Sequence, residues 1–311
     1  MTCLNDLWRT EMSVTVQVPA TTANIGPGFD CLGAALQLYN RFTFTPQQDA
    51  LTIIASGMNA DRVGLDSGNM AYTAFAKLFS HLGKPIPGIH IDLQMSIPLA
   101  RGLGSSATAI VGGLVGANHL AGNPLSTSEI ADLATDIEGH PDNVVPALCG
   151  GCRLSATGLD RSWEVSELPW HPRIIPVVAI PAFELSTQEA RQVLPLTYDR
   201  SSVVFNMAHL GLLMQGLATA NPDWLKAGLQ DQIHQPFRQS LISHYDEVRR
   251  AALAAGAHGL VISGAGPTLL ALTTPETAEP VRSAMVLAWE TVGISAQGMV
   301  LELDRQGAQI L

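Results

Sequence analysis

The chain has few charged residues, few aromatic rings and no long apolar run. Charged residues make up 14% of its 311 residues, aromatic residues 5% and apolar residues 47%, a balance typical of a compact enzyme rather than of a disordered chain. The net charge of −10 argues against a nucleic-acid partner, which would need a basic surface. One of the longest apolar runs, residues 174–183, contains two prolines, so we expect no membrane-spanning segment.

Cysteine is also scarce, and the four in the chain are Cys3, Cys31, Cys149 and Cys152. Cys149 and Cys152 have the spacing of half a zinc site. A structural zinc site needs a second such pair, which the sequence lacks. We therefore expect both to be small buried residues in a glycine-rich strand.

The first eleven residues contain two acids, Asp6 and Glu11, and lack the apolar core of a signal peptide. An alternating run of valines that is typical of a strand begins directly after them. We predict that residues 1–11 are a ragged extension. With no secretory segment, a reducing cytoplasm is the expected location.

The most informative segment combines two glycines and two serines between a strand-like run and a run of small apolar residues. Its residues are Pro98, Leu99, Ala100, Arg101, Gly102, Leu103, Gly104, Ser105, Ser106, Ala107 and Thr108. Glycine allows a tight turn and close approach of the backbone to a ligand. The N–H groups and the dipole of the following helix favour a phosphate there. The segment predicts a phosphate-binding loop, in which Ser105 and Ser106 could hold a phosphate oxygen or a magnesium ion.

Two better-known loops and one structural alternative compete with this interpretation. A Walker loop needs a lysine that is absent here. The spacing Gly102-x-Gly104-x-x-Ala107 fits a loose dinucleotide fingerprint, but residues 98–101 separate it from the preceding strand. A small-residue helix start packed under a sheet would explain the same composition without any ligand.

The order of predicted elements is mixed, which favours an α+β fold over a doubly wound sheet. Strands are predicted at 13–19, 40–45, 51–55, 89–95, 174–180, 258–262 and 297–303, and helices at 69–82, 107–121, 126–138, 201–219, 224–230, 242–255 and 276–293. Residues 140–144 are expected to form a polar turn, 145–154 a glycine-rich strand and 163–170 a loop. The predicted domains are 12–165 and 166–311.

Three separated glycine-containing segments, Pro19–Asp30, Pro98–Thr108 and Ser263–Pro267, resemble in order and spacing the superfamily of galactokinase, homoserine kinase, mevalonate kinase and phosphomevalonate kinase (GHMP). Nearly the whole chain from residue 13 can be laid on this pattern. Within it, the chain is most similar to the homoserine kinase family. The segments that distinguish the homoserine kinase family within the superfamily are Asn24 with Phe29–Gly33, Glu138–Val144, Ser186–Arg191 and Gln235–Arg238.

The resemblance implies a ribosomal-protein-S5-domain-2-like N-terminal domain and a ferredoxin-like C-terminal domain, with ATP between them. It also implies ATP-dependent phosphorylation of L-homoserine to O-phospho-L-homoserine, a step towards threonine. L-Homoserine and ATP are then the expected partners, and a homodimer is compatible with the pattern. The Ser263–Pro267 turn is expected to support the phosphate loop.

Homoserine is a zwitterion with a terminal hydroxyl, and the matched motifs contain groups for each part of it. Asp30 and Asn24 are assigned to the ammonium, and Arg191 and Arg238 to the carboxylate, which a planar guanidinium binds well. Asn143 is assigned to the acceptor hydroxyl. The remaining binding assignments are Thr187, four residues before Arg191 on one helix face, and Asn69 in the adenine pocket.

Magnesium is expected to bridge the β- and γ-phosphates, held by Ser106 and an acidic residue. Relatives commonly have a glutamate eleven residues before the asparagine of the turn. That position is Asp132 here, whereas the glutamate is Glu138. We favour Glu138 slightly and keep Asp132 as the alternative.

Asn143 stands where some relatives have an aspartate that is taken to be the base, and an amide cannot accept a proton at neutral pH. We therefore hypothesise catalysis by positioning and charge neutralisation, with Asn143 and Arg191 as catalytic residues. Asp142 is the alternative, as a base. Rival functions are a kinase for another small alcohol such as mevalonate or shikimate, an ATP-binding sensor without activity, and a dinucleotide-dependent oxidoreductase.

Overall fold

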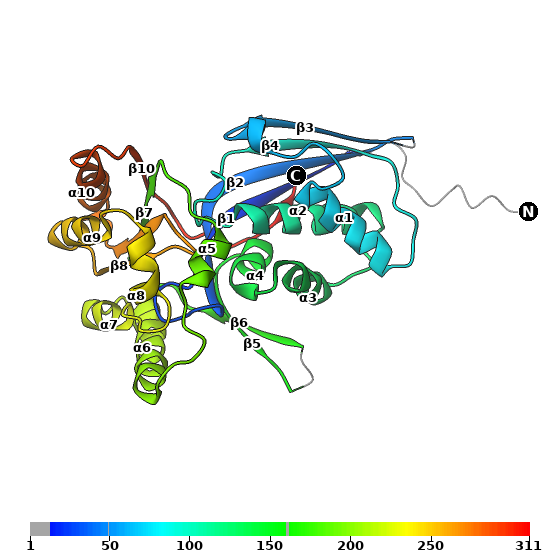
Figure 1. Cartoon of the computed structure of the whole chain (residues 1–311). Coiled ribbons are helices and arrows are strands. Elements are labelled where there is room, and N and C mark those ends of the chain that lie inside the picture. The colour runs from blue at the N-terminus through cyan, green and yellow to red at the C-terminus, as the bar shows by residue number, and fades with distance from the viewer. Residues whose placement is uncertain (1–12, 49, 160–161) are drawn as a thin grey trace, which may run out of the picture.

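The computed structural model describes residues 13–48, 50–159 and 162–311. The extension predicted at 1–11 lies outside these ranges. The described chain forms two units side by side, each built on its own β-sheet (Figure 1). Both units mix helices with largely antiparallel strands, so the α+β class is confirmed and the doubly wound sheet is not found.

The first unit contains a seven-stranded sheet in the order β11-β1-β2-β4-β3, with β5 paired to β2 and β6 paired to β5. Its strands are β1 (Val14–Ala23), β2 (Leu32–Pro46), β3 (Leu51–Gly57), β4 (Ile89–Met95), β5 (Cys152–Thr157), β6 (Trp163–Leu168) and β11 (Gln309–Ile310). Strands from both ends of the chain thus share one sheet. The domain boundary at 165/166 stays a prediction.

Four α-helices pack against one face of this sheet (Figure 1). They are α1 (Met70–His81), α2 (Ser105–Leu120), α3 (Thr127–Glu138) and α4 (Pro141–Cys149), and a short 3-10 helix, η1 (Ala60–Arg62), precedes them. Apolar residues at every second position of β1, Val14, Val16 and Val18, point into the core that these helices close.

The second unit contains a four-stranded sheet in the order β10-β7-β9-β8. These strands are β7 (Ile175–Pro181), β8 (Gly259–Ile262), β9 (Leu269–Thr273) and β10 (Ala296–Val300). The remaining helices are α5 (Thr187–Gln192), α6 (Arg200–Thr219), α7 (Pro222–Gly228), α8 (Gln235–Arg238), η2 (Gln239–Leu241), α9 (Tyr245–Ala254) and α10 (Ala278–Glu290).

Successive residues of β7 face opposite layers of this second unit. Val177 and Ala179 pack with α9 and α10, whereas Val178 and Ile180 pack with α6, α7 and the ends of β1 and β2. One apolar core therefore extends across the junction of the two units. No helix in the described ranges combines the length and the apolar character that crossing a bilayer requires.

Three local predictions were wrong. The turn at 140–144 and the strand expected at 145–154 give way to α4, because Pro141 starts the helix and apolar Val144, Val145 and Leu148 follow at helical spacing. Cys149 therefore ends a helix, whereas Cys152 is buried in a strand as expected.

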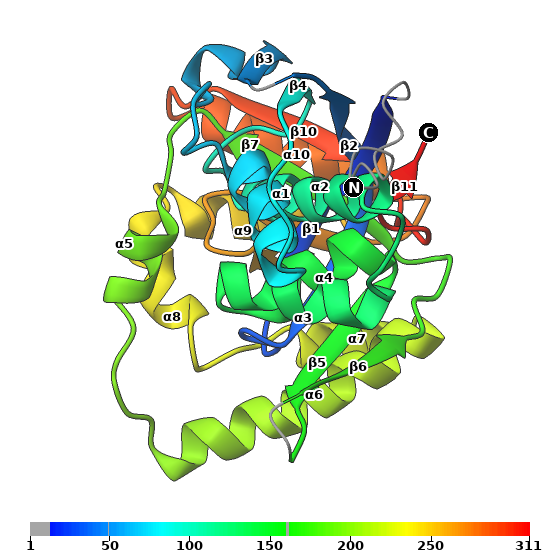
Figure 2. The ribbon, with the colours of Figure 1, turned by 90° about the vertical axis from the view of Figure 1, so that its right-hand side faces the viewer.

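The loop expected at 163–170 contains β6, which pairs with β5 in an exposed ribbon beside α6 (Figure 2). A ribbon with little buried surface shows no apolar alternation in its sequence. The strand predicted at 40–45 is only the second half of β2, which begins at Leu32.

Helix α2 needs glycine where it lies on β2. A Cβ at Gly112 would lie 2.5 Å from the ring of Phe42, and one at Gly116 would lie 2.5 Å from the ring of Phe44. These glycines allow the helix to sit close to the sheet.

Replacing glycine by alanine at this contact should change the free energy of unfolding in the opposite direction from the same replacement in an exposed helix. We expect Gly116→Ala to lower the free energy of unfolding by about 1–3 kcal/mol through overpacking. Gly211→Ala in α6, where a Cβ meets nothing within 4 Å, should raise it by about 0.5–1 kcal/mol through helix propensity. Urea unfolding of both variants measures the difference, and equal effects would contradict the packing account.

Candidate active site

A cavity of about 450 Å³ lies at the junction of the two units. Its walls come from the phosphate loop, the starts of α1 and α4, the loop after β1, and α5, α8 and the turn after β8. Of the predicted site residues, those that line it are Asn24, Asp30, Asn69, Leu99, Ala100, Arg101, Gly102, Gly104, Ser105, Ser106, Glu138, Asp142, Asn143, Thr187, Arg191 and Arg238. Those outside the lining are Pro98, Leu103, Ala107, Thr108 and Asp132.

The phosphate loop adopts backbone conformations that favour glycine. Gly102 and Gly104 have φ values of 76° and 66°, and a Cβ at Gly104 would lie 1.9 Å from the hydroxyl of Thr21. Gly104 is also the N-cap of α2 and offers no side-chain cap to its first N–H groups. The buried hydroxyl of Ser105 has no hydrogen-bond partner in the described chain. Such a helix start with free polar groups suits an anion.

The backbone of the loop is held by hydrogen bonds from both units. The Thr21 N–H of β1 donates to the Leu103 carbonyl over 3.1 Å. From the second unit, the hydroxyl of Ser263 donates to the Gly102 carbonyl over 2.7 Å, and the Thr268 N–H donates to the Arg101 carbonyl over 3.3 Å. The expected support of the loop by the 263–267 turn is therefore present.

Arg101 adds a side-chain tie across the same junction. Its guanidinium donates to the Ala182 carbonyl over 2.8 Å and lies 3.1 Å from the carboxylate of Glu184. Arg62 pairs with the same carboxylate. Glu184 consequently has a lowered pKa of about 2, mainly through the hydrogen bond from Arg62. The side chain of Arg101 is thus engaged by the second unit, and its role towards ATP stays a prediction.

One wall of the cavity is acidic. Glu138 accepts a hydrogen bond from the Ser106 hydroxyl over 3.0 Å, and burial raises its pKa despite that bond. Asp142, which is almost fully buried, lies 2.5 Å from Nδ1 of His140. A carboxylate oxygen of Asp30, a ring nitrogen of His140 and a carboxylate oxygen of Asp142 lie within 4.8 Å of one another.

Asn143 follows Asp142 in the first turn of α4, and its Oδ1 accepts a hydrogen bond from the Thr21 hydroxyl over 2.7 Å. Because this bond uses Oδ1, Nδ2 is the atom of the amide that can donate to a ligand in the cavity.

Two arginines next to these acidic residues lie over one aromatic ring. Arg191 forms two hydrogen bonds with the carboxylate of Asp30, at 2.7 and 3.0 Å. Arg238 is 2% exposed and donates to the carbonyls of Ala190 and Gly264. The guanidinium carbons lie 5.7 Å (Arg191) and 5.0 Å (Arg238) from the centre of the Phe29 ring.

Arg238 takes part in no carboxylate ion pair within the described ranges. Burial, together with the charge of Arg191, lowers its pKa. A buried cation that has only neutral acceptors is costly unless an anion joins it. The position therefore suits the carboxylate of a ligand.

Comparison with known proteins agrees with this arrangement. Residues 69–151 match the model of the GHMP kinase N-terminal domain, and residues 213–291 match that of the GHMP kinase C-terminal domain. Homoserine kinase from Synechococcus sp. is 57% identical over 96% of this chain and 98% of its own length. The one from Microchaete diplosiphon is 58% identical over 96% of this chain and 97% of its own length. The chain belongs to the homoserine kinase family.

Solved structures support the same family. The crystal structure of homoserine kinase from Cytophaga hutchinsonii superposes with a TM-score of 0.86 and 30% identity, over 100% of this chain and 99% of that one. L. major mevalonate kinase, at 14% identity, shares the fold alone, with a TM-score of 0.68 over 96% of this chain and 98% of that one. The resemblance and the two-domain fold that it implied are thus confirmed.

In this homoserine kinase family member, two residues that were predicted to bind ligands already form hydrogen bonds within the protein. Asn24 donates to the Gly264 carbonyl over 2.8 Å and accepts from the Asp30 N–H over 3.0 Å. Asn69 caps α1 and donates to the Gly64 carbonyl over 2.7 Å. Both line the cavity, and their contacts with homoserine and adenine stay predictions.

Sequence reasoning assigned no role to Phe29 or His140 of this family member. Phe29 precedes Asp30 in a quoted segment, but only the fold places both arginines over its ring. His140 is the N-cap of α4, and its place two residues before Asp142 in the segment Glu138–Val144 was the only signal in the sequence.

Substitution of Asp142 should change the titration of His140. Burial opposes the charge of His140, but the hydrogen bond and the charge of Asp142, with Glu138 and Asp30, raise its pKa. We expect Asp142→Asn to lower this pKa, because the first of these raising causes is removed. NMR titration of the imidazole measures it.

The raised pKa of His140 also determines how the stability of this variant depends on pH. Protonated His140 stabilises the native protein below about pH 6.5, and this contribution is lost as the pH rises through the raised native pKa. Asp142→Asn should therefore reduce the loss of stability over that range. An unchanged His140 pKa would contradict the pairing.

Proposed function

We propose that this chain transfers the γ-phosphate of ATP to the hydroxyl of L-homoserine, forming ADP and O-phospho-L-homoserine, a step towards threonine. The observation that carries the proposal is the buried Arg238, which pairs with no carboxylate of the described chain and lies in the same cavity as the phosphate loop. Membership of the homoserine kinase family supports it.

The amino-acid end of the substrate fits the charges of the cavity. Arg238 and Arg191 bind its carboxylate, and Asp30 binds its ammonium. The Asp30–Arg191 pair neutralises itself before substrate arrives. A zwitterion can enter such a pair charge for charge, because it supplies one anion to the arginine and one cation to the aspartate. Mevalonate has no ammonium and would leave Asp30 beside an anionic ligand.

The triphosphate binds at the start of α2. Backbone N–H groups around Gly102 and Gly104, together with the free hydroxyl of Ser105, meet its oxygens. Asn69 and the residues around it form the adenine side of the cavity.

The oxygen ligands at the acidic wall suit magnesium. Ser106 and Glu138 are hydrogen-bonded to each other and offer one hydroxyl and one carboxylate oxygen, the hard donors that this ion prefers. Glu138 accepts a hydrogen bond from Ser106 of the loop and lines the cavity, whereas Asp132 lies outside the cavity lining. Magnesium bound there supplies charge neutralisation to the phosphates.

The acceptor hydroxyl is positioned rather than deprotonated by a strong base. Asn143, whose Oδ1 accepts a hydrogen bond from Thr21, donates through Nδ2 to the hydroxyl oxygen, and Arg191 orients the other end of the substrate. A loose transition state needs little early proton loss from the nucleophile. Asp142, engaged by His140, is the alternative base. Loss of turnover in Asp142→Asn with both affinities intact would contradict catalysis without a base.

A cytoplasmic location belongs to the same proposal, supported by the free thiols of Cys31, Cys149 and Cys152. A homodimer stays a prediction.

A coupled assay of ADP release tests the function directly. With purified protein, ATP and magnesium, we expect turnover with L-homoserine, and kcat/KM at least about a hundredfold lower with mevalonate and shikimate, because these leave charged groups of the site unpaired. Comparable turnover of mevalonate, or no turnover of homoserine, would contradict the proposal.

Paired amide variants decide between the two magnesium ligands. Glu138→Gln should raise the magnesium concentration for half-maximal activity by about tenfold or more, because a charged ligand is lost. Asp132→Asn is the matched control and should stay within about twofold of the unsubstituted protein. Titration of activity with magnesium measures both, and the reverse pattern would assign the role to Asp132.

A further inference from the structure

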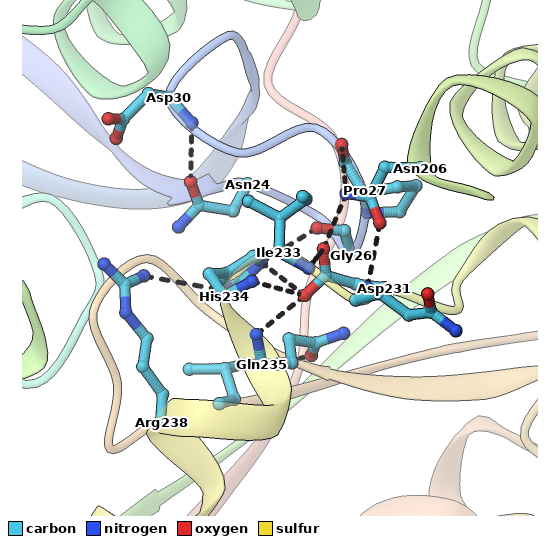
Figure 3. Close-up of polar contacts among 12 residues, drawn as sticks. Asn24, Gly26, Pro27, Asp30, Asn206, Asp231, Ile233, His234, Gln235 and Arg238 are labelled. Carbon is cyan, nitrogen blue, oxygen red and sulfur yellow. Dashed lines mark hydrogen bonds and ion pairs between the residues drawn. The ribbon is translucent and has the colours of Figure 1, made fainter. Parts of the chain in front are cut away.

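A buried polar cluster lies next to Arg238 (Figure 3), and its residues Asp231 and His234 do not belong to the cavity lining. Its centre is the carboxylate of Asp231, which is fully buried and accepts four hydrogen bonds. Oδ1 accepts from the side chain of Asn206 (2.7 Å) and the Ile233 N–H (3.0 Å). Oδ2 accepts from the N–H groups of His234 (2.9 Å) and Gln235 (2.6 Å). The start of α8 is thereby held in place.

The side chain of His234, also fully buried, joins two elements that carry substrate-binding charges. Its Nε2 lies 2.9 Å from the Gly26 carbonyl, and its Nδ1 lies 3.3 Å from Nη1 of Arg238 (Figure 3). A carbonyl can only accept and a guanidinium can only donate. His234 must therefore be neutral, with its proton on Nε2. Burial, with the charge of Arg238, lowers its pKa against the attraction of Asp231.

The same imidazole stacks on Phe29, with 5.2 Å between ring centres and 23° between planes. Phe29 immediately precedes Asp30, and its ring lies under the guanidinium of Arg238. His234 thus contacts the loop 24–30 twice, through Gly26 and through Phe29, and contacts Arg238 once.

We propose that His234 is a positioning residue for the amino-acid substrate. Held by Asp231, it fixes Arg238 relative to the loop that carries Asp30. The carboxylate-binding Arg238 and the ammonium-binding Asp30 are then held in a fixed position relative to each other. This inference rests on the proposed function, since it assigns these two groups to homoserine.

Two amide variants separate the contacts of the ring. Glutamine at position 234 can keep a donor near Gly26 but loses the acceptor for Arg238. Asparagine can keep that acceptor but loses the donor. We expect His234→Gln to raise the KM for homoserine about tenfold and His234→Asn about threefold, with the KM for ATP within about twofold.

His209→Gln is the control, because His209 stacks on Phe205 within α6 and lies outside the cavity lining. It should leave both KM values unchanged. A homoserine KM within about twofold of the unsubstituted protein in His234→Gln, or an equal rise in the KM for ATP, would overturn the proposal.

A second measurement uses the unsubstituted protein and does not depend on the folding of variants. With ¹⁵N-labelled histidine, NMR at neutral pH should show His234 neutral and protonated on Nε2. Homoserine should shift its Nδ1 resonance, whereas a non-hydrolysable ATP analogue alone should not. A charged ring, the opposite tautomer or an Nδ1 resonance insensitive to homoserine would overturn the proposal.

Failure of the proposed function can be distinguished from failure of the positioning role of His234. If the unsubstituted protein does not phosphorylate homoserine, the proposed function falls, and this inference falls with it. If it does so while the His234 measurements give the contrary results, only the positioning role is lost.

Discussion

The close approach of three backbone segments at the junction of the two units is the constraint on which the site depends. The end of β1, the phosphate loop and the turn after β8 meet around Gly102, where a Cβ would lie 2.3 Å from the Ser263 carbonyl. The Ser263 hydroxyl also lies 2.9 Å from the hydroxyl of Thr22 in β1, and the Gly264 N–H donates to the Ala23 carbonyl. Because these contacts are made by backbone and short side chains, they leave little freedom for one unit to shift against the other.

Charge is distributed over the cavity in a way that follows from this junction. Glu138 and Asp142 lie on the wall formed by α3 and α4, and the two arginines lie on the wall formed by α5 and α8. Asp30, on the loop between β1 and β2, lies between these two groups of charges and forms an ion pair with Arg191. Such a half-buried site strengthens charge interactions relative to water, so a ligand is selected by the order of its charges along its length.

Much of this site could be predicted from the sequence, because the local backbone conformation or the ligand chemistry requires particular residue types. Gly102 and Gly104 adopt left-handed conformations, and the resemblance of the motifs placed Arg191, Arg238 and Asp30 in one site. The role of His234 could not be read in this way, because its partner Gly26 lies 208 positions away. The start of α4 was misread because polar residues mask a helix whose apolar face begins only at Val144.

In the proposed reaction, one cavity at this junction holds the triphosphate and the amino acid together. A crystal structure with a non-hydrolysable ATP analogue, magnesium and L-homoserine would show this arrangement. We expect phosphates on the N–H groups ahead of residue 107, the carboxylate of homoserine between Arg191 and Arg238, and its hydroxyl at Asn143. Phosphates bound away from this loop, or an amino acid bound with its ends reversed, would contradict it.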